Sequence, residues 1–404
     1  MERLSTPNCK TKEEVFIIKT NRKKIMLIFG TRPEATKMCP VIQELKRHAE
    51  WFDTKVILTG QHREQLHQAL AHFDIKPDAD LNLMKENQSL AYITSAAIAG
   101  LDELIAQERP DLILIHGDTQ TAVCGGMAAF FHKIPVGHIE AGLRSHNKYS
   151  PWPEEINRKI VDVVSDLMFA PTSLSKDNLL RDGYEEHHIY VTGQTAVDAA
   201  LLTYDAQYDF HEDGLKPILN QQGRIITVTA HRKENVGVPM QNMFRAIRRI
   251  ADEHPDVAVV YPVHLSPTVR ETAYSMLSDH DRIHLLDPID YPDMINLLAR
   301  SYLILSDSGG LQEEAPVFNK PLILMRDTTE RPEAVAANAV YLTGTEESAI
   351  HAVATRLLTD QALYAAMSNA INPFGDGLAS QRIVHIIARH FGFVSELPAQ
   401  FGVK

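Results

Sequence analysis

Three carboxylates follow segments that the sequence predicts as β-strands, and together they could move protons. Asp118 lies in HGDTQ, Glu140 lies in IEAGLRS, and Glu154 opens a predicted helix in PWPEEINR. Taken singly, Asp118 could be only a helix cap, and Glu154 could be only an acid in a first helical turn. Clustered carboxylates, however, raise one another's pKa, so that one can act as an acid while another acts as a base. The pattern therefore predicts an acid–base site at one edge of a sheet.

Basic residues at two other predicted strand ends could bind an anion. Arg32 and Lys37 flank the start of a predicted helix in GTRPEATKM, and a helix N-terminus beside an arginine attracts phosphate. The alternative is an ordinary turn with a solvated arginine. His231 follows a predicted strand in AHRKEN, where it could donate to a phosphate or act as a catalytic acid. Otherwise it is a hydrogen-bonded, partly buried histidine.

The segment SDSGGLQEE joins a turn of small residues to the start of a helix. Ser308, Gly309 and Gly310 offer backbone N–H groups with little side chain in the way, which suits a diphosphate. Glu314 lies one helical turn past Gly310, where it could accept hydrogen bonds from ribose hydroxyls. We therefore predict that this segment binds a nucleoside diphosphate.

The elements that must position these residues alternate between strand and helix. The predicted strands are almost continuously apolar, which is typical of parallel strands buried on both faces, and the alternation predicts an α/β, doubly wound fold. Ligands of such sheets bind beyond the carboxyl ends of the strands. A polar stretch interrupts the rhythm once, so we predict two Rossmann-like domains that face a cleft. The expected parts are an N-terminal extension (1–22), a first domain (23–199), a linker (200–222) and a second domain (223–378).

Composition excludes several classes of protein. The chain has 404 residues, with 40 Lys+Arg against 52 Asp+Glu and a formal charge of −12, which does not suit a nucleic-acid backbone. Three cysteines without CxxC spacing fit a reducing compartment, and we find neither a signal-peptide pattern nor a long apolar window. We therefore predict a cytoplasmic protein that binds neither membrane nor nucleic acid. No GxGxxG follows a strand and the histidines lack metal-ligand spacing, so neither NAD nor a metal ion is expected.

These segments together resemble the non-hydrolysing UDP-N-acetylglucosamine 2-epimerases. The matching motifs run in order from about residue 25 to beyond 380 and include GTRPEATKM, TGQHRE, HGDT, HIEAGLRS, PEEINR, AHRKEN, SDSGGLQEEAP and RDTTERPE. The resemblance implies a glycosyltransferase-B-like architecture, with a C-terminal helix (379–404) that packs back on the first domain. It also implies a homodimer and a part in cell-surface polysaccharide biosynthesis. It assigns Asp118, Glu140 and Glu154 to the chemistry, and UDP binding to Arg32, His231, Ser308, Gly309, Gly310 and Glu314.

The implied reaction is the reversible conversion of UDP-N-acetylglucosamine to UDP-N-acetylmannosamine. The proton on carbon 2 is not acidic, and oxidation of carbon 3 would need a dinucleotide. Elimination of UDP makes carbon 2 acidic, and a carboxylate then removes its proton to leave 2-acetamidoglucal. Readdition of UDP, with a proton delivered to the other face, gives the epimer. Alternatives are a hydrolysing epimerase that releases N-acetylmannosamine and UDP, a retaining glycosyltransferase, and a non-catalytic UDP-sugar sensor.

The segment TGQHRE comes after the second predicted strand and should also face the cleft. Gln61, His62 and Arg63 offer an amide, an imidazole and a guanidinium there. The resemblance implies that a second molecule of UDP-N-acetylglucosamine binds there as an activator. The alternative is an ordinary helix start with solvated polar groups.

Overall fold

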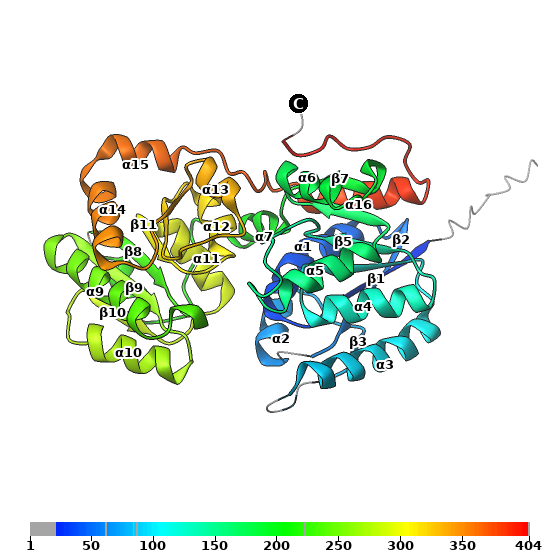
Figure 1. Ribbon diagram of the computed structural model, residues 1–404, viewed down its shortest axis with the longest axis horizontal. Coiled ribbons are helices and arrows are strands. Elements are labelled where there is room, and N and C mark those ends of the chain that lie inside the picture. Colours follow the sequence, from blue (N-terminus) through cyan, green and yellow to red (C-terminus); the bar gives the residue numbers. More distant parts are fainter. Residues whose placement is uncertain (1–21, 61–62, 84, 86–87, 222, 403–404) are drawn as a thin grey trace, which may run out of the picture.

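The structure, a computed structural model, describes residues 22–60, 63–83, 85, 88–221 and 223–402. It contains two sheets, each made of parallel strands and covered by helices on both faces (Figure 1). The seven-stranded sheet has the order β3-β2-β1-β4-β5-β6-β7 and the six-stranded sheet the order β10-β9-β8-β11-β12-β13. The predicted α/β fold with two Rossmann-like sheets is confirmed.

The first sheet is built from strands in the first half of the chain: β1 Lys23–Phe29, β2 Phe52–Leu58, β3 Ala79–Asp80, β4 Leu112–His116, β5 Val136–Ile139, β6 Leu167–Ala170 and β7 Ile189–Val191. The second sheet comes after it in sequence: β8 Arg224–Thr229, β9 Val257–Pro262, β10 Ile283–Leu286, β11 Leu303–Ser306, β12 Leu322–Leu324 and β13 Val340–Leu342.

The helices of the first half are α1 Arg32–Arg47, α2 Arg63–His72, α3 Leu90–Glu108, α4 Gln120–Phe131, α5 Glu154–Val163, α6 Ser173–Arg181 and α7 Thr195–Thr203. The later helices are α8 Leu215–Leu219, α9 Val238–Glu253, α10 Pro267–Leu277, α11 Tyr291–Arg300, α12 Leu311–Glu314, α13 Pro332–Ala336, α14 Glu347–Thr359, α15 Gln361–Ser368 and α16 Ala379–His390. None of the helices in the described ranges is long and apolar enough to cross a membrane.

Both faces of β1 are buried, which explains why its run of apolar residues is continuous. Ile25, Leu27 and Phe29 belong to the core beneath α1 and α16, whereas Met26 and Ile28 belong to the core beneath α3 and α4. Successive side chains of a strand point to opposite faces. A strand buried on both sides must therefore be apolar at every position, and the sheet holds its strand ends rigidly at the cleft.

The last helix returns to the first sheet. Ile383 and Ile387 of α16 join the core formed by α1 and β1, and α16 contacts both α1 and α7. Asp198 of α7 caps the N-terminus of α16, because its carboxylate accepts hydrogen bonds from the Ala379 amide at 3.2 Å and the Ser380 amide at 2.7 Å. The chain therefore passes twice between the two sheets, once after α7 and once before α16.

Candidate active site

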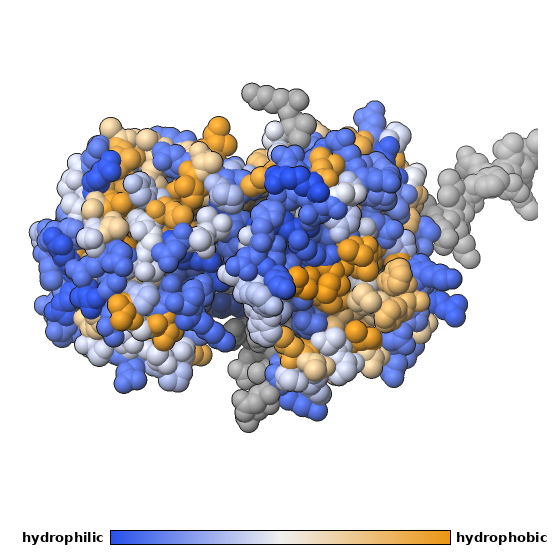
Figure 2. Space-filling model, viewed as in Figure 1, coloured by the Kyte–Doolittle hydropathy of each residue, from blue (hydrophilic) through white to orange (hydrophobic). Residues whose placement is uncertain are grey.

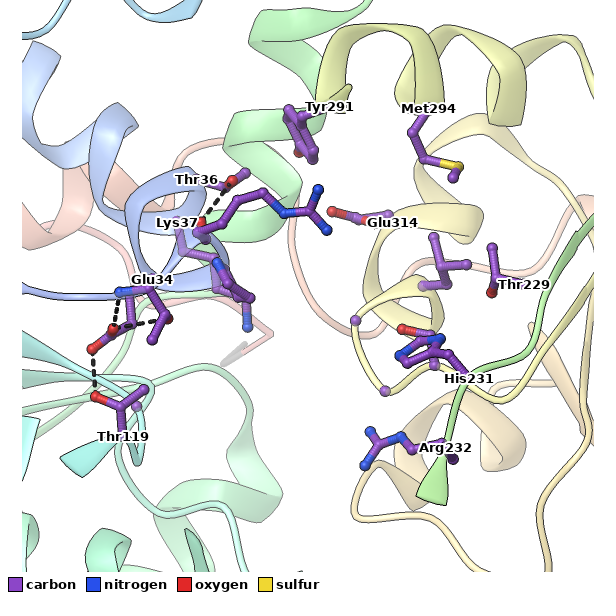
Figure 3. A pocket seen from close by; sticks show the side chains of 18 of the residues that line it. Glu34, Thr36, Lys37, Thr119, Thr229, His231, Arg232, Tyr291, Met294 and Glu314 are labelled. Atoms are coloured by element: carbon purple, nitrogen blue, oxygen red, sulfur yellow. Dashed lines mark hydrogen bonds between the residues drawn. The ribbon is translucent and has the colours of Figure 1, made fainter. Parts of the chain in front are cut away.

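The carboxyl ends of the strands of both sheets face one cleft of about 590 Å³, and hydrophilic residues line the seam between the two halves (Figure 2). Lys37 projects from one wall of the cleft, and His231 and Arg232 project from the opposite wall (Figure 3). All ten residues predicted for chemistry or substrate binding line this cleft: Arg32, Lys37, Asp118, Glu140, Glu154, His231, Ser308, Gly309, Gly310 and Glu314.

Glu140 lies directly after β5, and its carboxylate is held by several neighbours. Its backbone has φ = +73°, a strained conformation for a residue with a side chain. The carboxylate pairs with the Lys37 ammonium and accepts a hydrogen bond from Gln194, and His116 Nε2 lies 3.8 Å away. Burial alone would raise the pKa of Glu140, but the charge of Lys37 and of the neighbouring cations outweighs burial and holds this pKa below its usual range. Glu140 is therefore ionised in this arrangement.

Glu313 joins this cluster from the other sheet. It is 1% exposed, and its carboxylate accepts a hydrogen bond from Arg331 Nε at 2.6 Å and lies 3.1 Å from Lys37 Nζ. Gln194 Nε2 donates to both Glu140 and Glu313. Two buried carboxylates thus alternate with two buried cations across the cleft, an arrangement that lowers the cost of burying each charge.

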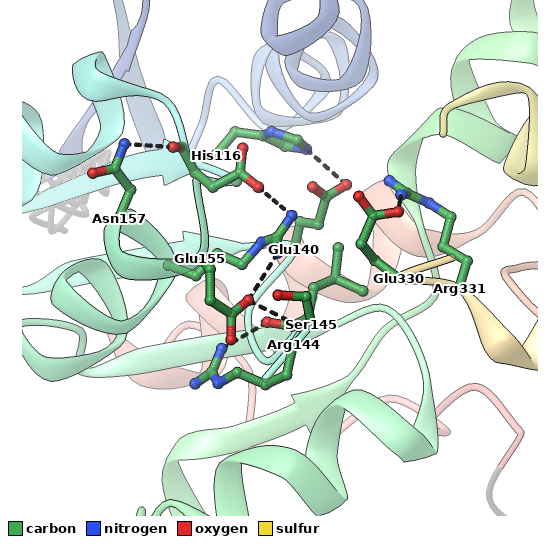
Figure 4. A network of polar contacts seen from close by, with 12 residues as sticks. His116, Glu140, Arg144, Ser145, Glu155, Asn157, Glu330 and Arg331 are labelled. Carbon is green, nitrogen blue, oxygen red and sulfur yellow. Dashed lines mark hydrogen bonds and ion pairs between the residues drawn. The ribbon is translucent and has the colours of Figure 1, made fainter. Parts of the chain in front are cut away.

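Asp118 lies just after β4 and is fixed by α5. Arg158 Nη2 lies 2.6 Å from Asp118 Oδ2, and Asn157 Nδ2 donates to the Asp118 carbonyl at 2.9 Å. Arg158 also pairs with Glu155 at 3.1 Å, whose carboxylate accepts the backbone amide of Ser145 at 2.8 Å (Figure 4). The same helix, α5, therefore orients Asp118 and holds the loop after Glu140 in place.

Glu154 opens α5 on the same wall. Burial, and to a smaller extent the nearby charge of Asp118, raises the pKa of its carboxyl group. Glu140 and Glu154 thus have pKa values pushed in opposite directions, which is the condition for an acid and a base to coexist in one site.

Glycines and arginines form the opposite wall. A Cβ on Gly309 would lie 3.0 Å from Arg331 Nη1 and 3.2 Å from Arg232 Nη2, whereas a Cβ on Gly310 would meet no atom within 4 Å. The Ser308 amide donates to Ser306 Oγ at 2.9 Å. Two guanidinium groups therefore lie against the glycine turn, where a diphosphate would meet positive charge and exposed backbone.

His231 is oriented by a fully buried aspartate. The Asp307 carboxylate accepts hydrogen bonds from the backbone amides of His231 at 3.0 Å and Arg232 at 2.9 Å. It also accepts one from Asn235 Nδ2 at 3.0 Å. The His231 ring stacks on His264 with centroids 5.4 Å apart. Burial lowers the pKa of His231, so the ring is neutral at neutral pH and can donate one hydrogen bond into the cleft.

Glu314 and Arg32 both line the cleft and are close enough for their charges to interact. Burial, and then the charge of Glu313, raises the pKa of Glu314 to about 7. Burial lowers the pKa of Arg32, and Glu314 partly offsets this effect. Gln61 and His62 of the predicted regulatory segment lie outside the described residues, and Arg63 begins α2.

Comparison with known proteins identifies the family of this chain. A sequence model of the family described as UDP-N-acetylglucosamine 2-epimerase matches residues 43–388. The chain belongs to the UDP-N-acetylglucosamine 2-epimerase family. A member of that name from Bacillus subtilis is 52% identical over 383 residues, which cover 94% of this chain and 99% of the relative.

Solved structures of the family share the whole fold. The co-structure of S. aureus MnaA with UDP has a TM-score of 0.88 at 48% identity, covering 94% of this chain and 100% of that one. The UDP-GlcNAc 2-epimerase from Neisseria meningitidis, bound to UDP-GlcNAc, has a TM-score of 0.84 at 44% identity and covers 91% and 100% of the two chains.

Several residues of this family member's cleft give no signal in the sequence. Glu313, Gln194 and Arg331 surround Lys37 and Glu140, although the strand-end pattern singles out only Glu314 in that part of the sequence. Arg331 and Gln194 do lie in segments with family-like motifs, RDTTERPE and VTGQTAVDA. Two side-chain contacts of this cluster, Lys37–Glu140 and Gln194–Glu313, join residues more than a hundred positions apart, so spacing along the chain cannot reveal them.

Proposed function

We propose that the protein catalyses the reversible epimerisation of UDP-N-acetylglucosamine to UDP-N-acetylmannosamine by elimination and readdition of UDP. One observation carries the proposal: the cleft sets carboxylates with oppositely shifted pKa values against a wall of glycine backbone and arginines. The relative from Bacillus subtilis bears the name UDP-N-acetylglucosamine 2-epimerase. The crystal structure of the Neisseria meningitidis enzyme has UDP-GlcNAc bound. Both support a UDP-sugar as the substrate of this chain.

In the proposed elimination, the bond between the anomeric carbon and the UDP oxygen breaks, and UDP leaves with the bonding electrons. A carboxylate removes the proton from carbon 2, so that a double bond forms between carbons 1 and 2. The products are 2-acetamidoglucal, UDP and a protonated carboxyl group. In the return step UDP attacks carbon 1, and a proton reaches carbon 2 from the opposite face of the ring.

Charges on the two walls match this reaction. Arg32, Arg232 and Arg331 would stabilise the negative charge that develops on UDP as it leaves. His231, held neutral, would donate a hydrogen bond to the diphosphate. Glu314 would accept hydrogen bonds from the ribose hydroxyls.

Carboxylates of the first sheet would act on the sugar. Glu140, ionised and held by Lys37, would stabilise the cationic character of the breaking bond or accept the proton. Asp118 and Glu154 would complete the acid–base set. The order in which the three act depends on which face of the ring each one meets.

Heavy water tests the reaction directly. We expect UDP-N-acetylglucosamine incubated with the protein in D₂O to give a mixture of both UDP-sugars that carry deuterium at carbon 2. Irreversible release of N-acetylmannosamine with UDP would identify a hydrolysing epimerase instead. A product that retains the original hydrogen at carbon 2 would contradict elimination, and dependence on an acceptor sugar would indicate a glycosyltransferase.

We also propose that a second UDP-N-acetylglucosamine binds beside Gln61, His62 and Arg63 and activates the enzyme. A ligand that shifts an equilibrium must bind the favoured state more tightly, so this molecule would bind the closed cleft best. We expect pure UDP-N-acetylmannosamine to react after a lag that a trace of UDP-N-acetylglucosamine removes, and Arg63→Ala to weaken this activation more than UDP binding. Progress curves without a lag, unchanged by the added sugar, would refute the activation.

A homodimer formed through α4 and α5 is the third part of the proposal. Apolar side chains gather over these two helices (Figure 2), and the exposed ones are Phe130, Phe131, Ile156, Ile160 and Val163. Contiguous apolar surface of this kind marks an interface. We expect Val163→Asp to reduce the mass measured by light scattering from that of two chains to that of one, while Ile371→Asp, a change at an even more exposed apolar residue elsewhere, leaves the mass unchanged. A wild-type mass of one chain would contradict the dimer.

A further inference from the structure

A fully buried histidine lies behind the turn that carries Asp118. His138, on β5, is 0% exposed. Its Nδ1 lies 2.7 Å from Asp162 Oδ1, and its Nε2 lies 2.9 Å from the carbonyl oxygen of Gly117. Asp162 belongs to α5, so this ring joins β5, α5 and the turn before Asp118.

Both atoms that the ring faces are hydrogen-bond acceptors. A backbone carbonyl can only accept, so Nε2 must carry a proton. Asp162 also forms an ion pair with Arg144, whose Nη2 lies 2.5 Å from Oδ2, so the carboxylate acts as an acceptor on this side too. An ionised carboxylate only accepts as well, so Nδ1 must carry the second proton. A neutral ring would place a lone pair against an oxygen at one of the two contacts.

Surrounding charges balance a cation at this position. Arg144 also pairs with Asp182 at 2.8 Å, so an imidazolium and a guanidinium face two carboxylates. The titratable and charged groups that surround His138 are Asp162, Arg144, Asp182, Tyr184 and His116, with Lys37 and Glu140 beyond His116. Burial lowers the pKa of His116 to about 3, so that neighbour adds no second positive charge.

The Gly117 carbonyl matters because the next residue in the chain is Asp118. Gly117 has φ = +63°, and its amide donates to Ile139 O at 2.9 Å, so the turn is fixed at both of its polar groups. The carbonyl of Asp118 is itself held by Asn157. Losing the proton on Nε2 would leave the buried Gly117 carbonyl without its donor, which is unfavourable for a buried acceptor, and the turn would move to find another.

We propose that His138 carries protons on both ring nitrogens in the folded protein and is a positioning residue that holds the Gly117 turn and so aims Asp118 into the cleft. The role of Asp118 rests on the proposed function, but the protonation state of His138 does not. The two parts of the inference can therefore be tested separately.

Nitrogen NMR tests the protonation state in the full-length protein. With ¹⁵N-labelled histidine, and with the His138 signals assigned by their absence from His138→Gln, we expect both ring nitrogens to show directly bonded protons at neutral pH. In Asp162→Asn an amide N–H can donate to Nδ1, and we expect that nitrogen to lose its proton. A wild-type ring with one unprotonated nitrogen at this pH would overturn the inference, whatever reaction the protein catalyses.

Kinetics test the positioning role. We expect His138→Gln to lower kcat by about tenfold to 10²-fold, the usual effect of a small misplacement, with UDP affinity unchanged. The matched control is His351→Gln, which removes a buried histidine paired with Glu253 at 2.8 Å in the other half of the chain. Asp162→Asn is the conservative variant: its amide preserves both hydrogen bonds of the ring, so its kcat should stay near that of the control. Turnover of His138→Gln equal to that of the control, or a loss of turnover in Asp162→Asn as large as that expected for His138→Gln, would remove the positioning role.

Discussion

The two walls of the cleft are built on different principles. On the wall of the first sheet, side chains are fixed by other side chains: Glu140 by Lys37 and Gln194, and Asp118 by Arg158. On the wall of the second sheet, the glycine turn exposes backbone groups to the cleft. Asp307 fixes the segment after β8 by accepting hydrogen bonds from the backbone amides of that segment. The first wall thus presents a cluster of carboxyl groups that can exchange protons, and the second presents mainly backbone amides and guanidinium groups, whose charge stays constant.

This difference suits the two walls to two different tasks, stabilisation of a leaving group and proton transfer. A leaving group with diffuse negative charge needs many weak donors in fixed places, which backbone amides and guanidinium groups supply. Proton transfer needs a few carboxyl groups with tuned pKa values, and tuning requires specific neighbours. Changes on the first wall should therefore affect turnover, and changes on the second wall should affect affinity.

The largest expected effect is that of Glu140→Gln. The amide keeps the shape of the side chain but can neither accept a proton nor pair with Lys37, so kcat should fall by about 10²–10⁴, while UDP affinity, measured by calorimetry, should change little. Glu186→Gln is the control, because Glu186 pairs with Lys176 at 2.6 Å on the exposed surface. Near-normal turnover in Glu140→Gln would remove Glu140 from the chemistry.

A matched pair of glycine variants tests the second wall. Gly309→Ala places a methyl group 3.0 Å from Arg331 Nη1 and 3.2 Å from Arg232 Nη2, so both guanidinium groups must shift. We expect its affinity for UDP to fall about tenfold, or about 1.4 kcal/mol. Gly310→Ala has open space around its Cβ and should bind UDP as the wild type does. Equal affinities in the two variants would show that the glycine turn is only structural.

Proton release tests the place of Glu314 in the comparison, since it is the carboxyl group proposed to bind UDP. Its pKa is raised to about 7 by burial and by the charge of Glu313, and ribose hydroxyls would stabilise its ionised form. UDP-N-acetylglucosamine binding should therefore release a fraction of a proton near pH 7, and affinity should fall as pH drops from 7 toward 5. Calorimetry in buffers of different ionisation enthalpy measures this release, which Glu314→Gln should abolish. Release that persists in the variant would assign the proton to another group.

Ser308→Ala should have the smallest effect. The backbone amide of Ser308 is retained and already donates to Ser306 Oγ, so only a hydroxyl is lost. We expect UDP affinity to weaken by no more than about 1 kcal/mol, with kcat unchanged. A loss of turnover comparable to that of Glu140→Gln would break the division between the two walls.

Residues that directly follow predicted strands indicated much of this site from the sequence. The residues that this rule missed were missed for a physical reason. Asp118, Glu140 and His231 could be found because parallel strands deliver their carboxyl ends to one edge. Glu313 could not be distinguished from Glu314, because which neighbour faces Arg331 depends on the rotation of the short helix α12. The double contact of His138 was missed for a similar reason: Gly117 and Asp162 lie 21 and 24 positions away and meet the ring only once β4, β5 and α5 are packed.

The return of α16 to the first sheet has a consequence for how the chain folds during synthesis. Ile383 and Ile387 complete the core beneath α1 and β1, yet they follow the whole second sheet in sequence and leave the ribosome only after it. Domains generally form from the N-terminus onward as the chain emerges, but here the first half must wait with an apolar face uncovered while the second half emerges and folds. The order of synthesis and the order of completion are therefore reversed, and nascent chains lacking the final helix are the ones that most need a chaperone.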